Sequence, residues 1–164
     1  MRNLDLQLLR VMRTRGHTPG VEKLARILGK AGNNGAIWVV LCLGVLAVTD
    51  SNGEAWLICA LLAPVAIAFN YMVKLIVKRP RPVLEGLPPL GGAPSSLSFP
   101  SAHATSSFAV ATAMTRVEPV AAIAFLLAAA LALGRPYLGM HYPSDVLAGA
   151  LLGVALGVVV PLSL

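Results

Sequence analysis

Long apolar runs separated by short polar stretches fill residues 35–164. The first run covers residues 35–49 and the second covers residues 55–77. The third, residues 104–133, is interrupted by a charged pair followed by proline, a pattern typical of two helices joined by a tight turn. A last run extends from about Pro143 to the end of the chain. Because a membrane-spanning helix needs about 20 apolar residues, the pattern predicts an all-α, polytopic membrane helical bundle with about five transmembrane helices.

Two shorter amphipathic helices are predicted in residues 1–30, ahead of the apolar runs. Between Asn3 and Met12, the apolar residues fall on one helical face and charged residues surround it. In the second helix, Thr18 is a suitable N-cap and Pro19 suits the first helical position. Such helices either lie in the lipid headgroup layer or pack on the surface of the bundle, and the sequence leaves both alternatives open.

The composition agrees with a membrane protein, because 57% of the residues are hydrophobic and only 12% are charged. Soluble domains have about 45–50% apolar and about 25% charged residues. We therefore expect one membrane-embedded domain over residues 1–164. Trp38 and Trp56 lie near the ends of the first two runs and are expected at the membrane interface. Cys42 and Cys59 lie inside apolar runs, which indicates neither a disulfide framework nor a metal site.

The net charge of +6 is compatible with either nucleic acid or lipid headgroups as the partner. Seven of the 13 basic residues lie in residues 1–30 with no Phe, Tyr or Trp among them for base stacking, so no nucleic-acid partner is expected. Five spans would place twelve basic residues on the face of the N-terminus and Arg116 alone on the other. The positive-inside rule then predicts a multi-pass cell (inner) membrane protein whose N-terminus and active site face the cytoplasm.

Basic residues gather in two loops, 78–103 and 134–145, and at the helix ends beside them. They are Lys74, Lys78, Arg79, Arg81 and Arg135. The acids nearby are Glu85 and Asp145, too few to neutralise five cations. Arginine forks suit phosphate oxygens, and helix N-termini near Ser101 and at the start of the last span add N–H donors. The missing partner is therefore an anion, and phosphate fits best.

Two histidines would supply chemistry at this site. His141 lies four residues before Asp145, so the carboxylate can bind one ring nitrogen and leave the other free as a nucleophile. His103 follows Ser101 at a helix start and is placed to protonate a departing oxygen. Because basic residues outnumber acids, the site would hold a divalent metal poorly, and we expect neither a metal nor a cofactor.

Each of these residues also has a structural interpretation. His17 is interpreted as a headgroup contact or a satisfied polar residue, and Lys78 and Arg79 are interpreted as headgroup or topology charges rather than catalytic groups. Asp145 can stabilise a helix N-terminus by its charge alone, and the Ser and Thr residues of 101–115 can serve close helix packing. Together, however, these interpretations require three separate groups of polar residues, in 74–81, 99–103 and 134–145, to lie on one face of the bundle by coincidence. A functional site explains this arrangement better.

The spacing resembles that of the type 2 phosphatidic acid phosphatases, the lipid phosphate phosphatases, whose active site is related to that of vanadium haloperoxidases. The family has three motifs: Lys, six residues and Arg-Pro; Pro-Ser-Gly-His; and Ser-Arg, five residues, His, three residues and Asp. They are matched, in order, by Lys74 with Arg81-Pro82, by Pro100-Ser101-Ala102-His103, and by Arg135, His141 and Asp145. Gly134 stands where the family usually has Ser, and Ala102 where it has Gly. Neither change touches the nucleophile or acid, so weaker binding or a tighter pocket is expected rather than inactivity.

The resemblance implies that His141, held by Asp145, attacks phosphorus and that water then cleaves the phosphohistidine. It implies that His103 protonates the leaving alcohol and that vanadate inhibits the reaction. The substrate-binding residues that it implies are Lys74, Arg81, Ser101, Ala102 and Arg135.

A lipid phosphate is the expected substrate, because its tail can stay in the bilayer while the phosphate enters the helix ends. A cytoplasmic site favours phosphatidylglycerophosphate, phosphatidate or a polyprenylphosphoryl sugar phosphate over undecaprenyl diphosphate, whose recycling usually needs an outward-facing site. Residues 98–105 and 139–145 are similar to actinobacterial decaprenylphosphoryl-5-phosphoribose phosphatases. A non-catalytic phospholipid-binding scaffold and a vanadate-dependent haloperoxidase remain alternatives, and the sequence indicates no oligomeric state.

Overall fold

The computed structural model describes residues 2–91 and 96–162, and this part of the chain is helical without a β-strand. Its elements are α1 (Arg2–Thr14), α2 (Pro19–Ala31), the 3-10 helix η1 (Asn33–Gly35), α3 (Ala36–Leu46), α4 (Gly53–Val77), α5 (Ala102–Val117), the 3-10 helix η2 (Pro119–Ile123), α6 (Ala124–Tyr137) and α7 (Pro143–Val159). The predicted all-α fold is confirmed.

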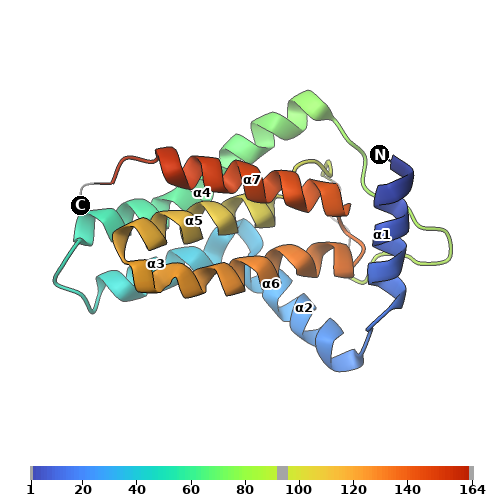
Figure 1. The fold of residues 1–164 in the computed structure, drawn as a ribbon, viewed down its shortest axis with the longest axis horizontal. Helices are drawn as coiled ribbons and strands as arrows, with labels where there is room; N and C mark the ends of the chain where they lie inside the picture. Colours follow the sequence, from blue (N-terminus) through green and yellow to red (C-terminus); the bar gives the residue numbers. More distant parts are fainter. Residues whose placement is uncertain (1, 92–95, 163–164) are drawn as a thin grey trace.

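Helix α5 lies in the middle of the bundle and packs against α4, α6 and α7, while α3 packs along α4 (Figure 1). Eleven of the 16 residues of α5 are buried, including several Ser and Thr. The hydroxyls of Thr105, Ser106 and Thr112 each donate to the carbonyl oxygen four residues earlier, which satisfies them inside the bundle. For these three residues the interpretation as close-packing residues is confirmed.

Glycines along α7 let it approach α5 closely. A Cβ at Gly149 would lie 2.6 Å from the Ser101 carbonyl oxygen, and one at Gly153 would lie 2.9 Å from the Ala109 nitrogen. Only glycine permits these approaches. The Ser101 N–H also donates to the Asp145 carbonyl oxygen at 2.9 Å. The first turns of the two helices are therefore fixed side by side.

Proline sets helix boundaries where the sequence predicts them. Helix α5 ends at Val117, and Glu118 before Pro119 is extended, with φ −138° and ψ 115°, because a residue that precedes proline disfavours the helical region. At the start of α2, the Thr18 hydroxyl accepts the Val21 N–H at 3.3 Å. The predicted break after α5 and the predicted cap of α2 are both confirmed.

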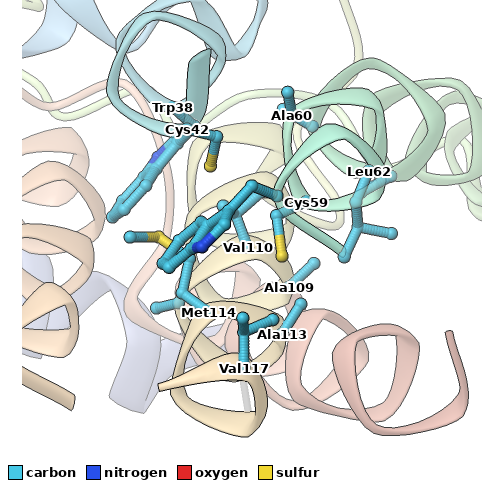
Figure 2. Packing of buried hydrophobic residues seen from close by; sticks show 14 of the residues in the cluster. Trp38, Cys42, Cys59, Ala60, Leu62, Ala109, Val110, Ala113, Met114 and Val117 are labelled. Atoms are coloured by element: carbon cyan, nitrogen blue, oxygen red, sulfur yellow. The ribbon is translucent and has the colours of Figure 1, made fainter. Parts of the chain in front are cut away.

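The expected interfacial placement of the two tryptophans is wrong. Trp38 is fully buried and Trp56 is 4% exposed, and both belong to a core to which α3, α4, α5 and α6 contribute. Figure 2 shows Trp38 in this core. The Trp38 indole N–H donates to Ser107 Oγ at 2.9 Å, so its polar edge is satisfied inside the bundle instead of among headgroups. Cys42 and Cys59 lie in the same core as free thiols.

The N-terminal helices pack on the bundle, which is one of the two alternatives that the sequence leaves open. Helix α1 crosses one end of the bundle and contacts α6 and α7, while α2 packs on α6 (Figure 1). Leu9 and Ala25 are the buried apolar residues of these contacts. Both helices also expose large apolar side chains, namely Leu4, Leu8, Val11, Val21, Leu24 and Ile27.

Two stretches of the described chain, Gly53–Val77 and Pro119–Tyr137, are long and apolar enough to cross a membrane. Asn33–Leu46 and Pro143–Val159 are shorter apolar helices. Large apolar side chains are exposed along α4 and α7, namely Leu61, Val65, Phe69, Ile76, Leu147, Leu151 and Val158. Exposed apolar surface on this scale is typical of contact with lipid or another protein, and it supports membrane association.

Candidate active site

Six of the eight predicted site residues line one cavity of about 140 Å³. The cavity lies at the helix ends that α1 crosses. Its residues come from α4, α5, α6, the loops before α5 and α7, and the segment of Gly32 and η1 after α2. The six residues are Lys74, Arg81, Ala102, His103, Arg135 and His141. Asp145 contacts His141 from the first turn of α7, and Ser101 is the N-cap of α5. The structure therefore brings the three motifs together.

The chain leaves α4 abruptly and folds back across the site. Lys78 caps α4 in the left-handed region, with φ 52° and ψ 32°, and Pro80 and Pro82 cannot continue a helix. The Ser98 N–H then donates to the Arg79 carbonyl oxygen at 2.8 Å. The two ends of the loop are thereby held together beside the cavity.

His141 lies against Asp145, as the spacing of four residues predicts. Its Nδ1 is 3.5 Å from Asp145 Oδ2, and Arg81 Nη1 is 3.3 Å from its Nε2. A guanidinium only donates, so Nε2 carries the lone pair and Nδ1 carries the proton that faces the carboxylate. Burial lowers the pKa of His141 to about 4, although Asp145 acts in the opposite direction. The imidazole is therefore neutral at pH 7, the state that a nucleophile needs.

Asp145 is fully buried and its carboxylate accepts hydrogen bonds from three donors. Oδ1 accepts from Arg79 Nη1 at 2.7 Å. Oδ2 accepts from the Tyr142 N–H at 2.9 Å and from the Ser98 hydroxyl. Asp145 thus caps the first turn of α7 and also faces His141. The structural interpretation of Asp145 and the predicted contact with His141 are therefore compatible.

Arg79 links three segments at this site, and its interpretation as a headgroup or topology charge is wrong. Its guanidinium pairs with Asp145 Oδ1 and with Asp5 Oδ2, each at 2.7 Å, and lies 3.8 Å from the centre of the Tyr142 ring. Asp5 also accepts the Ser144 N–H at 3.1 Å. Arg79 and Asp5 therefore connect α1 to the start of α7, directly behind the His141–Asp145 pair.

Sequence reasoning misses Asp5 and Ser98 as residues of this network. Asp5 is the only acidic residue of α1. A lone acid in a basic amphipathic helix indicates a specific ion-pair partner elsewhere in the chain. Its partner Arg79 lies 74 positions later, so spacing gives no indication of the pair. Ser98 is one of several serines in its loop and offers no such signal.

Positive charge in the cavity exceeds negative charge. Lys74 and Arg81 donate to backbone carbonyl oxygens at 2.7 and 2.6 Å rather than to carboxylates. Arg135 is 6% exposed, and within the described residues neither its Nε nor the buried Ser101 Oγ has a hydrogen-bond partner. Buried polar groups are normally satisfied. The three cations therefore form a site suited to a phosphate dianion.

The two departures from the family motifs differ in position. Ala102 lines the cavity, where its backbone N–H lies in the first turn of α5. Gly134 instead faces α2, because a Cβ there would lie 3.8 Å from the Cβ of Ala25. The Ser side chain that the family usually has at this position would therefore contact α2.

Two basic residues near the N-terminus make internal contacts. The His17 ring stacks on Tyr137 at a centroid distance of 3.9 Å, and its Nε2 is 3.0 Å from the Met12 carbonyl oxygen. Arg13 is 6% exposed and donates to the Pro88 carbonyl oxygen at 2.7 Å. Of the two interpretations of His17, the satisfied polar residue is therefore confirmed, because its ring stacks on Tyr137 and its Nε2 contacts a backbone carbonyl.

Several solved structures share this fold. LpxE of Aquifex aeolicus aligns with a TM-score of 0.76 and 27% identity over 95% of this chain and 93% of that chain. The transmembrane PAP2-type phosphatidylglycerolphosphate phosphatase of Bacillus subtilis aligns with a TM-score of 0.75 and 22% identity, over 96% and 82%. A bacterial vanadium-dependent iodoperoxidase aligns with a TM-score of 0.64 and 16% identity, over 94% of this chain and 46% of that chain.

Sequence comparison gives the family. The model of the PAP2 superfamily matches residues 54–164, which contain all three motifs. Decaprenylphosphoryl-5-phosphoribose phosphatase of Mycobacterium tuberculosis (strain CDC 1551 / Oshkosh) is 39% identical over 143 residues, covering 87% of this chain and 80% of that protein. The enzyme of the same name from Mycolicibacterium smegmatis is 38% identical over 148 residues, covering 90% and 82%. The chain belongs to the PAP2 superfamily, which confirms the resemblance seen in the motifs.

Proposed function

We propose that the protein is a membrane-embedded, metal-independent phosphomonoesterase that removes the sugar phosphate of a polyprenylphosphoryl sugar phosphate such as decaprenylphosphoryl-5-phosphoribose. The observation that carries the proposal is the cavity in which three cations meet His103 and His141. Relatives named as phosphatases of this lipid, at 38–39% identity, support the reaction and the substrate. The excess of cations suits a dianionic ester better than a divalent metal.

In the proposed reaction, His141 Nε2 attacks phosphorus, and the ester P–O bond breaks as His103 passes a proton to the departing alcohol oxygen. Asp145 stabilises the positive charge that develops on the His141 ring. The three cavity cations hold the other phosphate oxygens. Water, which gives a proton to His103, then attacks phosphorus, the P–N bond breaks, and inorganic phosphate leaves.

We further propose five membrane spans with the N-terminus and the active site in the cytoplasm. The two long apolar helices, the two shorter ones and the excess of basic residues at the active-site end support this arrangement. In Glu85→Cys and Ser51→Cys variants, an impermeant maleimide added to intact cells should label only the Ser51→Cys variant. The native cysteines are buried and should not react. Labelling of the Glu85→Cys variant from outside would reverse the topology.

A substrate panel tests the proposed reaction. Purified protein in EDTA should release phosphate from decaprenylphosphoryl-5-phosphoribose at least about tenfold faster than from phosphatidate, phosphatidylglycerophosphate or undecaprenyl diphosphate, measured as inorganic phosphate. Loss of activity in EDTA would contradict metal independence. Faster release from another lipid would show that the other lipid, and not decaprenylphosphoryl-5-phosphoribose, is the preferred substrate. No release from any lipid would favour the non-catalytic scaffold.

A further inference from the structure

Helix α2 lies outside the residues matched by the family model, yet its end contacts two side chains of the active-site cavity. The Gly29 carbonyl oxygen is 2.9 Å from His103 Nε2. A Cβ at Gly32 would lie 2.9 Å from His103 Cδ2, and a Cβ at Gly29 would lie 2.8 Å from Arg135 Nη1. The two glycines therefore let α2 approach the cavity more closely than a larger residue would allow.

The Gly29 contact determines which nitrogen of His103 carries a proton. A backbone carbonyl oxygen only accepts, so Nε2 is protonated and Nδ1 is the ring nitrogen left for proton exchange. Gly29 lies in the last turn of α2, where carbonyl groups lack intrahelical partners and form the negative end of the helix dipole. Burial and the nearby Arg135 lower the pKa of His103 to about 4, whereas the Gly29 carbonyl oxygen acts in the opposite direction and favours the imidazolium.

We propose that the end of α2 is a positioning element that holds His103 as the acid of the phosphatase reaction, an inference that rests on the proposed function. A phosphate dianion bound in the cavity favours the charged ring, so His103 acts as the imidazolium, with Nε2–H bonded to Gly29. Its Nδ1 proton passes to the ester oxygen, which keeps the electron pair of the broken P–O bond and leaves as the alcohol. The neutral Nδ1 later takes a proton from the attacking water, while Gly29 keeps the ring in the same orientation.

The variant Gly32→Ala tests this role, because the new methyl group displaces the His103 ring. Two esters are compared: the lipid phosphate, whose alcohol must be protonated to leave, and p-nitrophenyl phosphate, whose leaving group departs as the anion. We expect kcat to fall about 10–100-fold for the lipid and less than about threefold for p-nitrophenyl phosphate. Gly20→Ala is the matched control in α2, since a Cβ there has no atom within 4 Å, and both rates should stay unchanged.

Equal losses with both esters would overturn the proposal, because they would indicate a general distortion, and so would unchanged lipid hydrolysis. If Gly32→Ala does not fold, ¹⁵N NMR of the wild-type protein labelled at histidine answers the same question, with His103→Gln for assignment. A His103 ring protonated at Nε2 supports the proposal, and one protonated only at Nδ1 overturns it. Wild-type protein that hydrolyses neither ester would contradict the proposed function, while the NMR result still reports on the Gly29 contact.

Discussion

Replacement of His141 with alanine is expected to lower phosphate release from the lipid substrate by at least about 10⁴-fold, because the attacking nitrogen is removed. The variant should still fold, since Asp145 keeps its hydrogen bonds to Arg79, Tyr142 and Ser98. Inorganic phosphate released by purified protein, with circular dichroism to show that the helices are intact, measures the effect.

The covalent intermediate provides a second readout for His141. Wild-type protein quenched during turnover should carry a phosphate that acid removes and base does not, as expected of a P–N bond, and His141→Ala should carry none. His17→Ala is the control, because His17 stacks on Tyr137 and is not among the residues that line the cavity. If His141→Ala kept a tenth of the activity or formed the intermediate, another residue would be the nucleophile.

The helices of the bundle are predictable because their signals are local. The end of α5 before Pro119 and the start of α7 at Pro143 depend on residues within one turn. The burial of Trp38 depends instead on Ser107, which is 69 positions away and supplies the acceptor for the indole N–H. A rule that places tryptophan at membrane interfaces cannot include such a contact, and for this reason it fails here.

The same difference separates the predicted from the missed residues of the site. Lys74, His103 and His141 were found because each sits in a motif of fixed spacing at a helix end. Asp5 and Gly29 come from helices that only the folded structure places against these ends. The motifs therefore identify the groups proposed to contact the phosphate. The groups that orient them come from other helices, which only tertiary packing places nearby.

Arg79→Gln is expected to lower the free energy of unfolding by about 2–4 kcal/mol and kcat by about 10–100-fold. The substitution removes the cation that lies between Asp5 and Asp145, and leaves both carboxylates buried without it. Asp145 is then less firmly held beside His141. KM should change little, because Arg79 is not among the residues that line the cavity. Thermal unfolding in detergent and steady-state kinetics with the lipid substrate give both quantities.

Lys78→Gln is the matched control for Arg79→Gln, because it removes the adjacent, exposed cation and should change stability by less than about 0.5 kcal/mol. Adding Asp5→Asn to Arg79→Gln should restore part of the lost stability, since one of the two uncompensated charges disappears. It should not restore kcat, because Asp145 still lacks the guanidinium. A loss of stability with wild-type kcat would instead show that Arg79 only joins α1 to α7, and that Asp145 holds His141 without it.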